Sequence, residues 1–336
     1  MTWQSEASAA KMSLARRSPR RLVKLLSAVL LGALIGVNGV AFMQVWAMTH
    51  FAESGERTAP PERLSVFDKV TVIFLGVNIP RPQNRRTPAD LSLAYETHRF
   101  ASPNATSLEA WYIPGKAALP LIALFHGYAA SKASLLSAAQ VFHELGFPTL
   151  LMDFYGSGGS SGTGTTIGVK EASDVAAAVD YVRRTWPNRK VVLYGISMGG
   201  AAVLRAIGTE KIHPDAVIVE ATFDSLLNAG KSRFRAMGLP ASPFAELSIF
   251  WGSVQTRSNL FLFNPADYAR SVNCPTLILQ GEKDERATLD QARAIAGAMR
   301  QNARFVSFAG VPHMSIVEAR SVEWTREVRD FLHGVF

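Results

Sequence analysis

The residues best suited to chemistry lie in one short stretch, Gly195-Ile196-Ser197-Met198-Gly199, which directly follows an apolar, β-branched run. A G-x-S-x-G pattern between a strand and a helix is typical of a nucleophilic serine, because the sharp turn raises the hydroxyl above a sheet. Gly195 and Gly199 lack the side chains that would collide where strand and helix cross. The alternative interpretation is a tight turn whose serine only caps the helix. We expect Ser197 to be the nucleophile.

A serine hydroxyl needs a base to attack at neutral pH, and the base needs a carboxylate that orients it. In this geometry the chain order is serine, acid and then histidine, with the acid and the histidine in loops after later strands. Asp284 follows the apolar run 276–279 and is our choice for the acid. Other carboxylates remain open as alternatives: Glu282, Glu285, Asp224 and Glu220.

The expected base is His313, in the Gly310-Val311-Pro312-His313 loop after the last apolar run. His213 and His333 are interpreted as structural or solvated, and His126 as a structural hydrogen-bonding residue. The oxyanion formed on a substrate needs two backbone donors. We expect them to be the amides of Met198, next to the nucleophile, and of Tyr128, in the loop after the run 121–125.

Short apolar runs alternate with amphipathic segments through the rest of the chain, which indicates a mostly parallel sheet covered by helices on both faces. The expected strands are 108–113, 121–125, 148–152, 190–194, 216–219, 276–279 and 304–308. The expected helices are 133–145, 169–186, 288–300 and 315–332. Residues 221–270 interrupt this rhythm and are rich in aromatic side chains. We interpret them as a small helical cap that roofs an apolar pocket, with Phe223 and Trp251 as substrate-binding candidates.

The N-terminal region predicts a membrane anchor. Residues 1–24 form a basic tail. Residues 25–48 are free of formal charge, and this stretch is long enough for a bilayer-spanning helix. The positive-inside rule then places the tail in the cytoplasm and the bulk of the chain on the far side. A cleaved signal peptide, with Gly39-Val40-Ala41 as its best cleavage signal, is the rival interpretation.

We expect residues 49–89 to form a linker or membrane-proximal segment and residues 90–336 to form the main domain. Residues 70–77 are apolar but too short to span a membrane, and the sequence leaves open whether they lie on the membrane surface or pack on the domain. Residues 79–88 hold three prolines and three arginines, which predicts an extended, solvated connector.

Five motifs in this order resemble the α/β-hydrolase superfamily: Phe125-His126-Gly127, Asp153-Phe154-Tyr155-Gly156-Ser157-Gly158-Gly159-Ser160, Gly195-Ile196-Ser197-Met198-Gly199-Gly200, Gly281-Glu282-Lys283-Asp284 and Pro312-His313. The likeness covers about residues 90–336 and is nearest to membrane-anchored, serine-aminopeptidase-like members. It implies the α/β-hydrolase fold and a serine hydrolase triad, but no substrate. Where such relatives often carry arginine after Asp-x, this chain has Tyr155, which leaves the bonding of that loop open.

Composition narrows the classes of function. The net charge of +8 is concentrated in residues 1–24, so the body of the chain offers no basic face for nucleic acid. One cysteine, Cys274, excludes an intrachain disulfide, and no histidine pair has metal-ligand spacing, so we expect no metal and no cofactor. We therefore expect a membrane-tethered serine hydrolase of carboxylic esters or thioesters with a lipid-like or small acyl substrate. The alternatives are a peptidase that binds an α-amine through Glu246 or Asp267, and a non-catalytic binding protein.

Overall fold

The computed structural model describes residues 19–299 and 302–336. The first eighteen residues of the expected basic tail, and Arg300 at the end of an expected helix, lie outside the described residues. The chain divides into two compact units, the part up to Val40 and the part from Ala41 to Phe336. The second unit holds the sheet, its covering helices and every residue for which a chemical role is expected.

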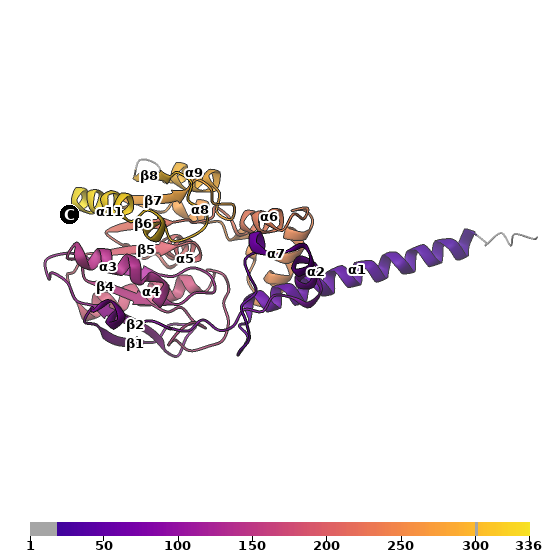
Figure 1. The fold of residues 1–336 in the computed structure, drawn as a ribbon, viewed down its shortest axis with the longest axis horizontal. Helices are drawn as coiled ribbons and strands as arrows, with labels where there is room; N and C mark the ends of the chain where they lie inside the picture. The colour runs from indigo at the N-terminus through magenta and orange to yellow at the C-terminus, as the bar shows by residue number, and fades with distance from the viewer. Residues whose placement is uncertain (1–18, 300–301) are drawn as a thin grey trace, which may run out of the picture. The chain divides into compact units, whose positions relative to one another are not determined.

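An eight-stranded sheet is formed by the described residues of the second unit, in the order β1-β2-β4-β3-β5-β6-β7-β8 (Figure 1). The six strands from β4 to β8 in this order are parallel, and β1 and β2 are antiparallel to their neighbours. The strands are β1 Glu96–Phe100, β2 Leu108–Ile113, β3 Leu121–Phe125, β4 Thr149–Met152, β5 Val191–Ile196, β6 Ala216–Glu220, β7 Thr276–Gly281 and β8 Ala303–Phe308. The parallel arrangement brings the carboxyl ends of β3, β5, β6, β7 and β8 to one edge of the sheet.

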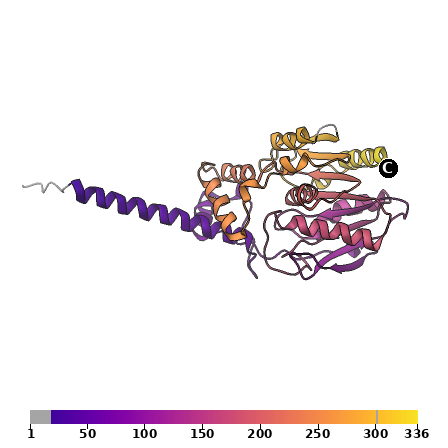
Figure 2. The ribbon, with the colours of Figure 1, turned by 180° about the vertical axis from the view of Figure 1, so that it is seen from behind.

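Helices cover the sheet on both faces (Figure 2). Helices α4, α5, α8 and α9 pack on one face, and α3, α10 and α11 pack on the other. The bounds of the α-helices among the described residues are α1 Pro19–Thr49, α2 Val66–Leu75, α3 Leu136–Glu144, α4 Glu171–Thr185, α5 Met198–Arg205, α6 Leu226–Ala236, α7 Phe244–Thr256, α8 Pro265–Ala269, α9 Leu289–Ala298, α10 Ile316–Ala319 and α11 Ser321–Val335. The fold is the α/β architecture that the alternation of apolar runs and amphipathic segments predicts.

Strand β3 shows why both faces need cover. Leu121, Ala123 and Phe125 pack in the apolar core that contains α4, α5 and α9, whereas Ile122 and Leu124 pack in the core that contains α3 and α11. Successive side chains on a strand point to opposite faces, so a strand buried on both sides must be apolar at every position. That requirement accounts for the uninterrupted apolar runs in the sequence.

Three local features differ from the expectations. Strand β1 was not predicted, because it is an edge strand with mostly exposed, charged side chains and lacks an apolar run. The expected helix 315–332 is broken into α10 and α11 at Arg320, whose backbone (φ −143°, ψ 54°) is not helical. The connector 79–88 is extended but not simply solvated: Ile79 is buried, and Arg81 donates hydrogen bonds to the carbonyl oxygens of Ser160 and Gly162.

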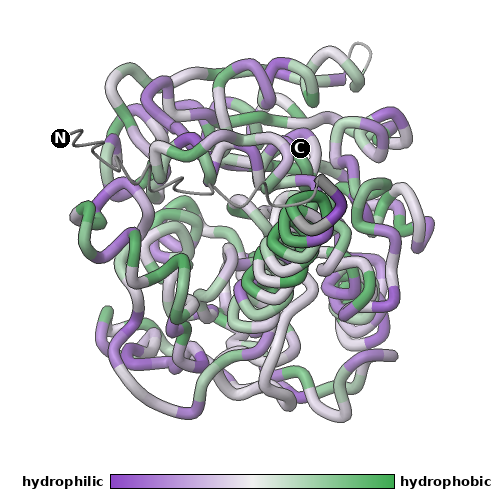
Figure 3. Tube along the Cα trace, turned by 90° about the vertical axis from the view of Figure 1, so that its right-hand side faces the viewer, coloured by the Kyte–Doolittle hydropathy of each residue, from purple (hydrophilic) through white to green (hydrophobic). Residues whose placement is uncertain are grey.

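Helix α1 contains one candidate membrane span among the described residues, Leu22–Thr49, of 28 residues, with an 18-residue stretch whose mean hydropathy is 2.2. Apolar positions dominate the trace of this helix (Figure 3). Its length and composition suit a bilayer-spanning helix, and a signal sequence would have the same properties.

Candidate active site

The turn between β5 and α5 holds Ser197 in a strained conformation. Its φ is +52°, a left-handed value that side chains other than glycine rarely adopt. The Ser197 amide donates to the carbonyl oxygen of Glu220 at 2.8 Å, which ties the turn to the end of β6. Glycine is required on both sides: a Cβ on Gly195 would lie 2.6 Å from the amide nitrogen of Gly200, and one on Gly199 would collide with the carbonyl oxygen of Phe125.

Three side chains meet at the carboxyl edge of the sheet, one from the loop after each of β5, β7 and β8. The Oγ atom of Ser197 lies 3.3 Å from Nε2 of His313. On the other side of the imidazole ring, Nδ1 lies 2.8 Å from Oδ2 of Asp284. A neutral histidine that donates from Nδ1 to a carboxylate has Nε2 free to accept a proton from a serine hydroxyl. The structure thus brings together the three residues that the sequence singled out.

The loop after β3 runs beside the nucleophile. A Cβ on Gly127 would lie 3.6 Å from Cβ of Ser197. Among the described residues, the amides of Met198 and Tyr128 donate no hydrogen bond to another group. Two such amides beside a nucleophile can stabilise negative charge that develops on a substrate oxygen. The phenol of Tyr128 is used elsewhere: its hydroxyl donates to the carbonyl oxygen of Met48 at 2.6 Å, and burial raises its pKa to about 12.

The chain is similar to several known proteins. Residues 116–242 match the family model described as serine aminopeptidase, S33. Protein bem46 of Schizosaccharomyces pombe is 25% identical over 208 residues, which are 60% of this chain and 65% of bem46, just under two thirds of that relative. The α/β hydrolase domain-containing protein WAV2 of Arabidopsis thaliana is 29% identical over 68% of this chain and 75% of its own length.

Solved structures share the fold. The esterase PF2001 of Pyrococcus furiosus superposes with a TM-score of 0.65 and 22% identity, over 76% of this chain and 97% of that one. The chain has the α/β-hydrolase fold. The esterase from Exiguobacterium antarcticum has a TM-score of 0.54 and 17% identity, over 71% of this chain and all of its own. At these identities the similarity to solved structures establishes the fold alone.

The acid loop is held by more than its contact with histidine. Oδ1 of Asp284 accepts hydrogen bonds from the amides of Arg286 and Ala287, each at 2.9 Å. The Gln280 side chain donates to Oδ2 of Asp284 at 3.3 Å and to the carbonyl oxygen of Ala287 at 2.7 Å. Sequence reasoning missed Gln280, although a polar residue at the end of an otherwise apolar, buried strand is a signal that could have found it.

Three of the four alternative acids have other hydrogen-bond partners. Glu282 accepts a hydrogen bond from the Ser307 hydroxyl, and Asp224 accepts one from Asn228. Glu220 is fully buried and accepts from the Tyr194 hydroxyl, the Trp324 indole and the Ile316 amide, at 2.7–2.9 Å. Burial raises the pKa of Glu220. Because Ile316 follows His313 by three residues, Glu220 fastens the loop that carries the histidine.

His126 is a structural residue, as expected from the sequence. It is fully buried, and burial lowers its pKa, which favours the neutral ring. Nε2 accepts a hydrogen bond from the Phe154 amide at 3.1 Å, and Nδ1 lies 2.8 Å from the carbonyl oxygen of Gly127. These bonds hold the loop after β3 against the loop after β4. His213 and His333 are exposed.

A buried lysine organises the loop after β4, and sequence reasoning missed it. Lys132 has no exposed surface and forms ion pairs with Asp153 and with Glu109, the latter at 2.9 Å. Burial by itself would raise the pKa of Asp153, but Lys132 keeps it below the usual value. The sequence left open how the loop around Tyr155 is bonded, because this residue departs from the family pattern. In the structure, the Tyr155 amide donates a hydrogen bond to Asp174 at 3.1 Å. Lys132 lies in a loop with no pattern that distinguishes it from an exposed lysine.

Helices α6, α7 and α8 lie between β6 and β7 in the chain, in the interval expected to form a cap. Phe223 is buried in an apolar cluster that includes Ile249 of α7, Ala201 of α5 and Ala287 of the acid loop. This cluster joins the interval to the region around Ser197. Trp251 packs edge-to-face against Phe42 of α1, with ring centroids 5.4 Å apart. Its expected contact with substrate stays a prediction.

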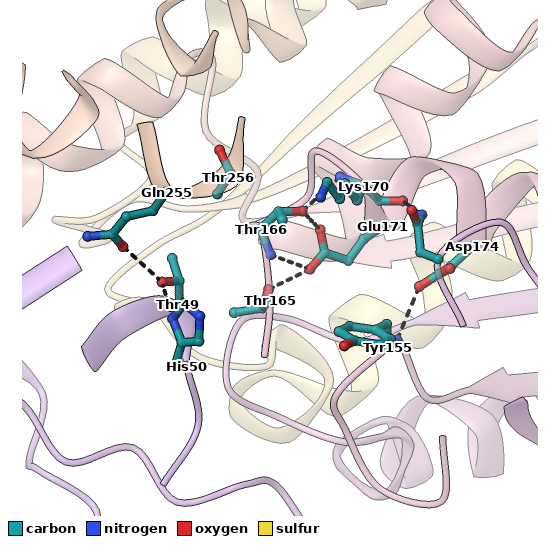
Figure 4. Close-up of a pocket in the computed structure, with 11 residues that line it drawn as sticks. Thr49, His50, Tyr155, Thr165, Thr166, Lys170, Glu171, Asp174, Gln255 and Thr256 are labelled. Carbon is teal, nitrogen blue, oxygen red and sulfur yellow. Dashed lines mark hydrogen bonds between the residues drawn. The ribbon is translucent and has the colours of Figure 1, made fainter. Parts of the chain in front are cut away.

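A polar cavity of about 240 Å³ lies between the end of α1, the start of α4 and the end of α7 (Figure 4). Glu171 on its wall accepts hydrogen bonds from both hydroxyls of Thr165 and Thr166, each at 2.5 Å. Asp174 accepts from Ser102 and Tyr155, and burial raises its pKa to about 6. Thr165 also lies 3.6 Å from the sulfur of Met198, so this wall borders the nucleophile turn.

The residues that the structure describes contain no group of three or more histidine, cysteine, aspartate or glutamate side chains placed to hold a metal ion. The two carboxylates considered as α-amine ligands are both paired. Glu246 lies 3.0 Å from Lys231, and Asp267 lies 3.7 Å from Arg270.

Proposed function

We propose that this α/β-hydrolase is a membrane-anchored serine hydrolase that cleaves carboxylic esters or thioesters through an acyl-enzyme on Ser197. The observation that carries the proposal is the continuous contact from Ser197 through His313 to Asp284 at the edge of the sheet. A structural histidine needs no serine hydroxyl in a strained turn on one side and a buried carboxylate on the other. Strain of this kind persists where the surrounding structure imposes it, and it is concentrated at functional sites.

In the proposed reaction, Oγ of Ser197 attacks the acyl carbonyl carbon while Nε2 of His313 takes the hydroxyl proton. Asp284 holds the ring in the productive tautomer and stabilises the imidazolium. The amides of Met198 and Tyr128 stabilise the tetrahedral oxyanion. His313 then gives its proton to the leaving alcohol or thiol. A water molecule, deprotonated by the same nitrogen, attacks the acyl-enzyme and releases the acid and the free serine.

Two observations favour an ester or thioester over a peptide. Glu246 and Asp267 each already have a basic neighbour, Lys231 and Arg270, with which a peptide α-amine would have to compete. The buried cluster that contains Phe223 makes the region between α7 and the nucleophile helix apolar. The names of the superposed esterases agree with this choice of substrate class. A serine peptidase that acts on short peptides and a non-catalytic binding protein are the alternatives that the experiment must separate.

The decisive experiment is covalent labelling by a fluorophosphonate probe, followed by assays with ester, thioester and short-peptide substrates. We expect the wild-type protein to be labelled and to hydrolyse a soluble short-chain ester. Ser197→Ala should abolish both, whereas Ser258→Ala, at a partly buried serine outside the site, should abolish neither. Labelling that persists in Ser197→Ala would exclude Ser197 as the nucleophile. An unlabelled protein that hydrolyses no substrate in the panel would favour a binding function.

We further propose that α1 stays in the mature protein as an anchor, with the basic tail in the cytoplasm and the hydrolase unit on the opposite side. The mass of the membrane-extracted protein tests retention, because cleavage near Ala41 would remove the span. A reporter enzyme that is active only outside the cytoplasm, fused after Phe336, tests orientation. A second fusion at the same position would carry a reporter that is active only in the cytoplasm. Activity of that second reporter would contradict the proposed orientation.

A further inference from the structure

Large apolar side chains are exposed together on three segments of the second unit. Helix α2 exposes Phe67 and Phe74, which are 79% and 63% accessible and lie two turns apart on one face. The end of α1 exposes Phe42 and Trp46, and α7 exposes Phe250 and Val254, four residues apart on one face. We call these six residues the α2–α7 surface. Isolated exposed apolar residues are common, but a gathered set marks an interaction surface.

These segments are neighbours, because α2 and α7 both contact the end of α1, from Ala41 to Thr49. The side chain of Gln44 on α1 donates hydrogen bonds to the carbonyl oxygens of Val72 and of Ile73, at 2.9 Å for the latter, at the end of α2. On the other side of α1, Gln255 of α7 donates to the carbonyl oxygen of Phe42 at 2.9 Å. The end of α1, α2 and α7 lie side by side in both ribbon views (Figures 1 and 2).

The buried side of α2 is also accounted for. Val72 is buried, and the helix begins with a capping box in which Ser65 and Asp68 bond to each other's backbone amides. Helix α2 is therefore a formed helix with one face on the protein. Its opposite, apolar face has no cover within the described residues of the second unit.

The length of the membrane span identifies what covers this face. The span has 28 residues, which at about 1.5 Å per residue make a helix of about 42 Å. The hydrocarbon core of a bilayer is only about 30 Å thick and needs about 20 residues. A span that begins at Leu22 therefore leaves the core near Ala41, and the following turns lie at the headgroup level. Trp46, whose ring stacks on His50 at 3.5 Å, is the residue type enriched at that level.

We propose that the α2–α7 surface rests in the boundary between headgroups and acyl chains of the same bilayer that α1 crosses. This inference rests on the anchor that we propose for α1. Its occupant is lipid, because the residues beside α2 and α7 are those that the span places at the membrane interface. Helix α7 also packs Ile249 into the cluster next to the nucleophile helix. One helix thus connects the membrane-facing surface with the wall of the candidate active site, an arrangement suited to acyl substrates dissolved in the bilayer.

The test places an environment-sensitive NBD fluorophore on the full-length protein in phosphatidylcholine vesicles. The labelled variants are Phe67→Cys and Val254→Cys, and the matched control is Val322→Cys, an 83% exposed apolar residue on α11. Burial raises the pKa of the native Cys274 thiol to about 11, so it reacts slowly at neutral pH. The wild-type protein under the same conditions measures that background.

We expect the labels at Phe67 and Val254 to emit at shorter wavelength than the label at Val322. A lipid with a doxyl group near the headgroup should quench these two labels more than a lipid with a doxyl group near the bilayer centre. Neither lipid should quench the label at Val322. Emission at Phe67 or Val254 equal to that at Val322, in protein that resists alkaline carbonate extraction, would overturn the docking and leave the anchor intact. Emission shifted to shorter wavelength without quenching by the doxyl lipids would overturn the membrane docking. It would indicate that a second copy of the chain covers the α2–α7 surface.

Extraction of the protein by carbonate would overturn the anchor and the docking together. The hydrolase proposal is tested separately, because hydrolysis of a soluble ester and fluorophosphonate labelling require neither the membrane anchor nor the docked α2–α7 surface. All three label positions are exposed and outside the candidate catalytic residues, so each variant should hydrolyse the soluble ester at the wild-type rate.

Discussion

Replacing Asp284 with asparagine tests the proposed mechanism most directly, because the surrounding structure determines which way the new amide must face. Oδ1 of Asp284 accepts from two backbone amides at 2.9 Å, and Oδ2 faces Nδ1 of His313 at 2.8 Å. Backbone amides can only donate. The carbonyl oxygen of the introduced asparagine must therefore take the place of Oδ1, which turns its NH₂ group toward His313.

An NH₂ group facing Nδ1 reverses the tautomer of the imidazole. Nδ1 must then accept, so the ring proton moves to Nε2, where it faces the hydroxyl of Ser197. A protonated Nε2 of a neutral ring cannot take the serine proton. We expect kcat/KM to fall about 10³–10⁴-fold, a loss of transition-state stabilisation of about 4–5.5 kcal/mol. The fall should be almost entirely in kcat, because the carboxylate does not contact substrate.

The assay is steady-state hydrolysis of a soluble p-nitrophenyl ester, with circular dichroism melting to show that the variant is folded. Glu282→Gln is the matched control: it changes a carboxylate of the same loop whose partner is the Ser307 hydroxyl. It should keep the wild-type kcat. A folded Asp284→Asn enzyme that retains most of its activity would refute the reasoning, and a large loss in Glu282→Gln instead would transfer the orienting role to that residue.

Two further predictions concern buried carboxylates. Glu220→Gln should lower the free energy of unfolding by about 2–4 kcal/mol, because an amide oxygen and an NH₂ group cannot accept the three hydrogen bonds that the carboxylate accepts; an unchanged urea midpoint would contradict this. Asp174 has its pKa raised to about 6 by burial, so its contribution to stability is fully present below about pH 4, the unfolded value, and is lost as pH rises through about 6. That loss amounts to about 3 kcal/mol. Asp174→Asn should flatten the pH dependence of unfolding in this range, and a pH profile identical to that of the wild type would count against the assignment.

Much of the central architecture could be predicted because it depends on patterns that are local in the chain. The strands from β2 to β7 are buried on both faces or nearly so, and continuous apolar runs indicate such strands. The turn at Ser197 is encoded by Gly195 and Gly199, since no other residue fits between strand and helix there. The order serine, acid, histidine follows from the positions of three loops along the chain.

Other features escaped prediction because they depend on surfaces that meet far apart in sequence. Strand β1 pairs through its backbone while its side chains are mostly exposed, so no apolar run marks it. Lys132 is buried only because Glu109 and Asp153 converge on it from β2 and the loop after β4. The connector is fixed by Arg81, whose acceptors are carbonyl oxygens about eighty residues further along the chain.

The sequence by itself determined the fold class, the apolar N-terminal helix and three candidate residues in their order, because periodicity, turn chemistry and hydrophobicity act over a few neighbouring residues. Only the tertiary structure decided which carboxylate meets His313 and which fastens its loop. It also decided that the carbonyl oxygens of Val72 and Ile73 on α2 accept hydrogen bonds from Gln44 of α1, while Phe67 and Phe74 are exposed. The physical reason is that hydrogen bonds and burial between distant segments depend on how those segments pack, and residue type alone does not reveal the partner.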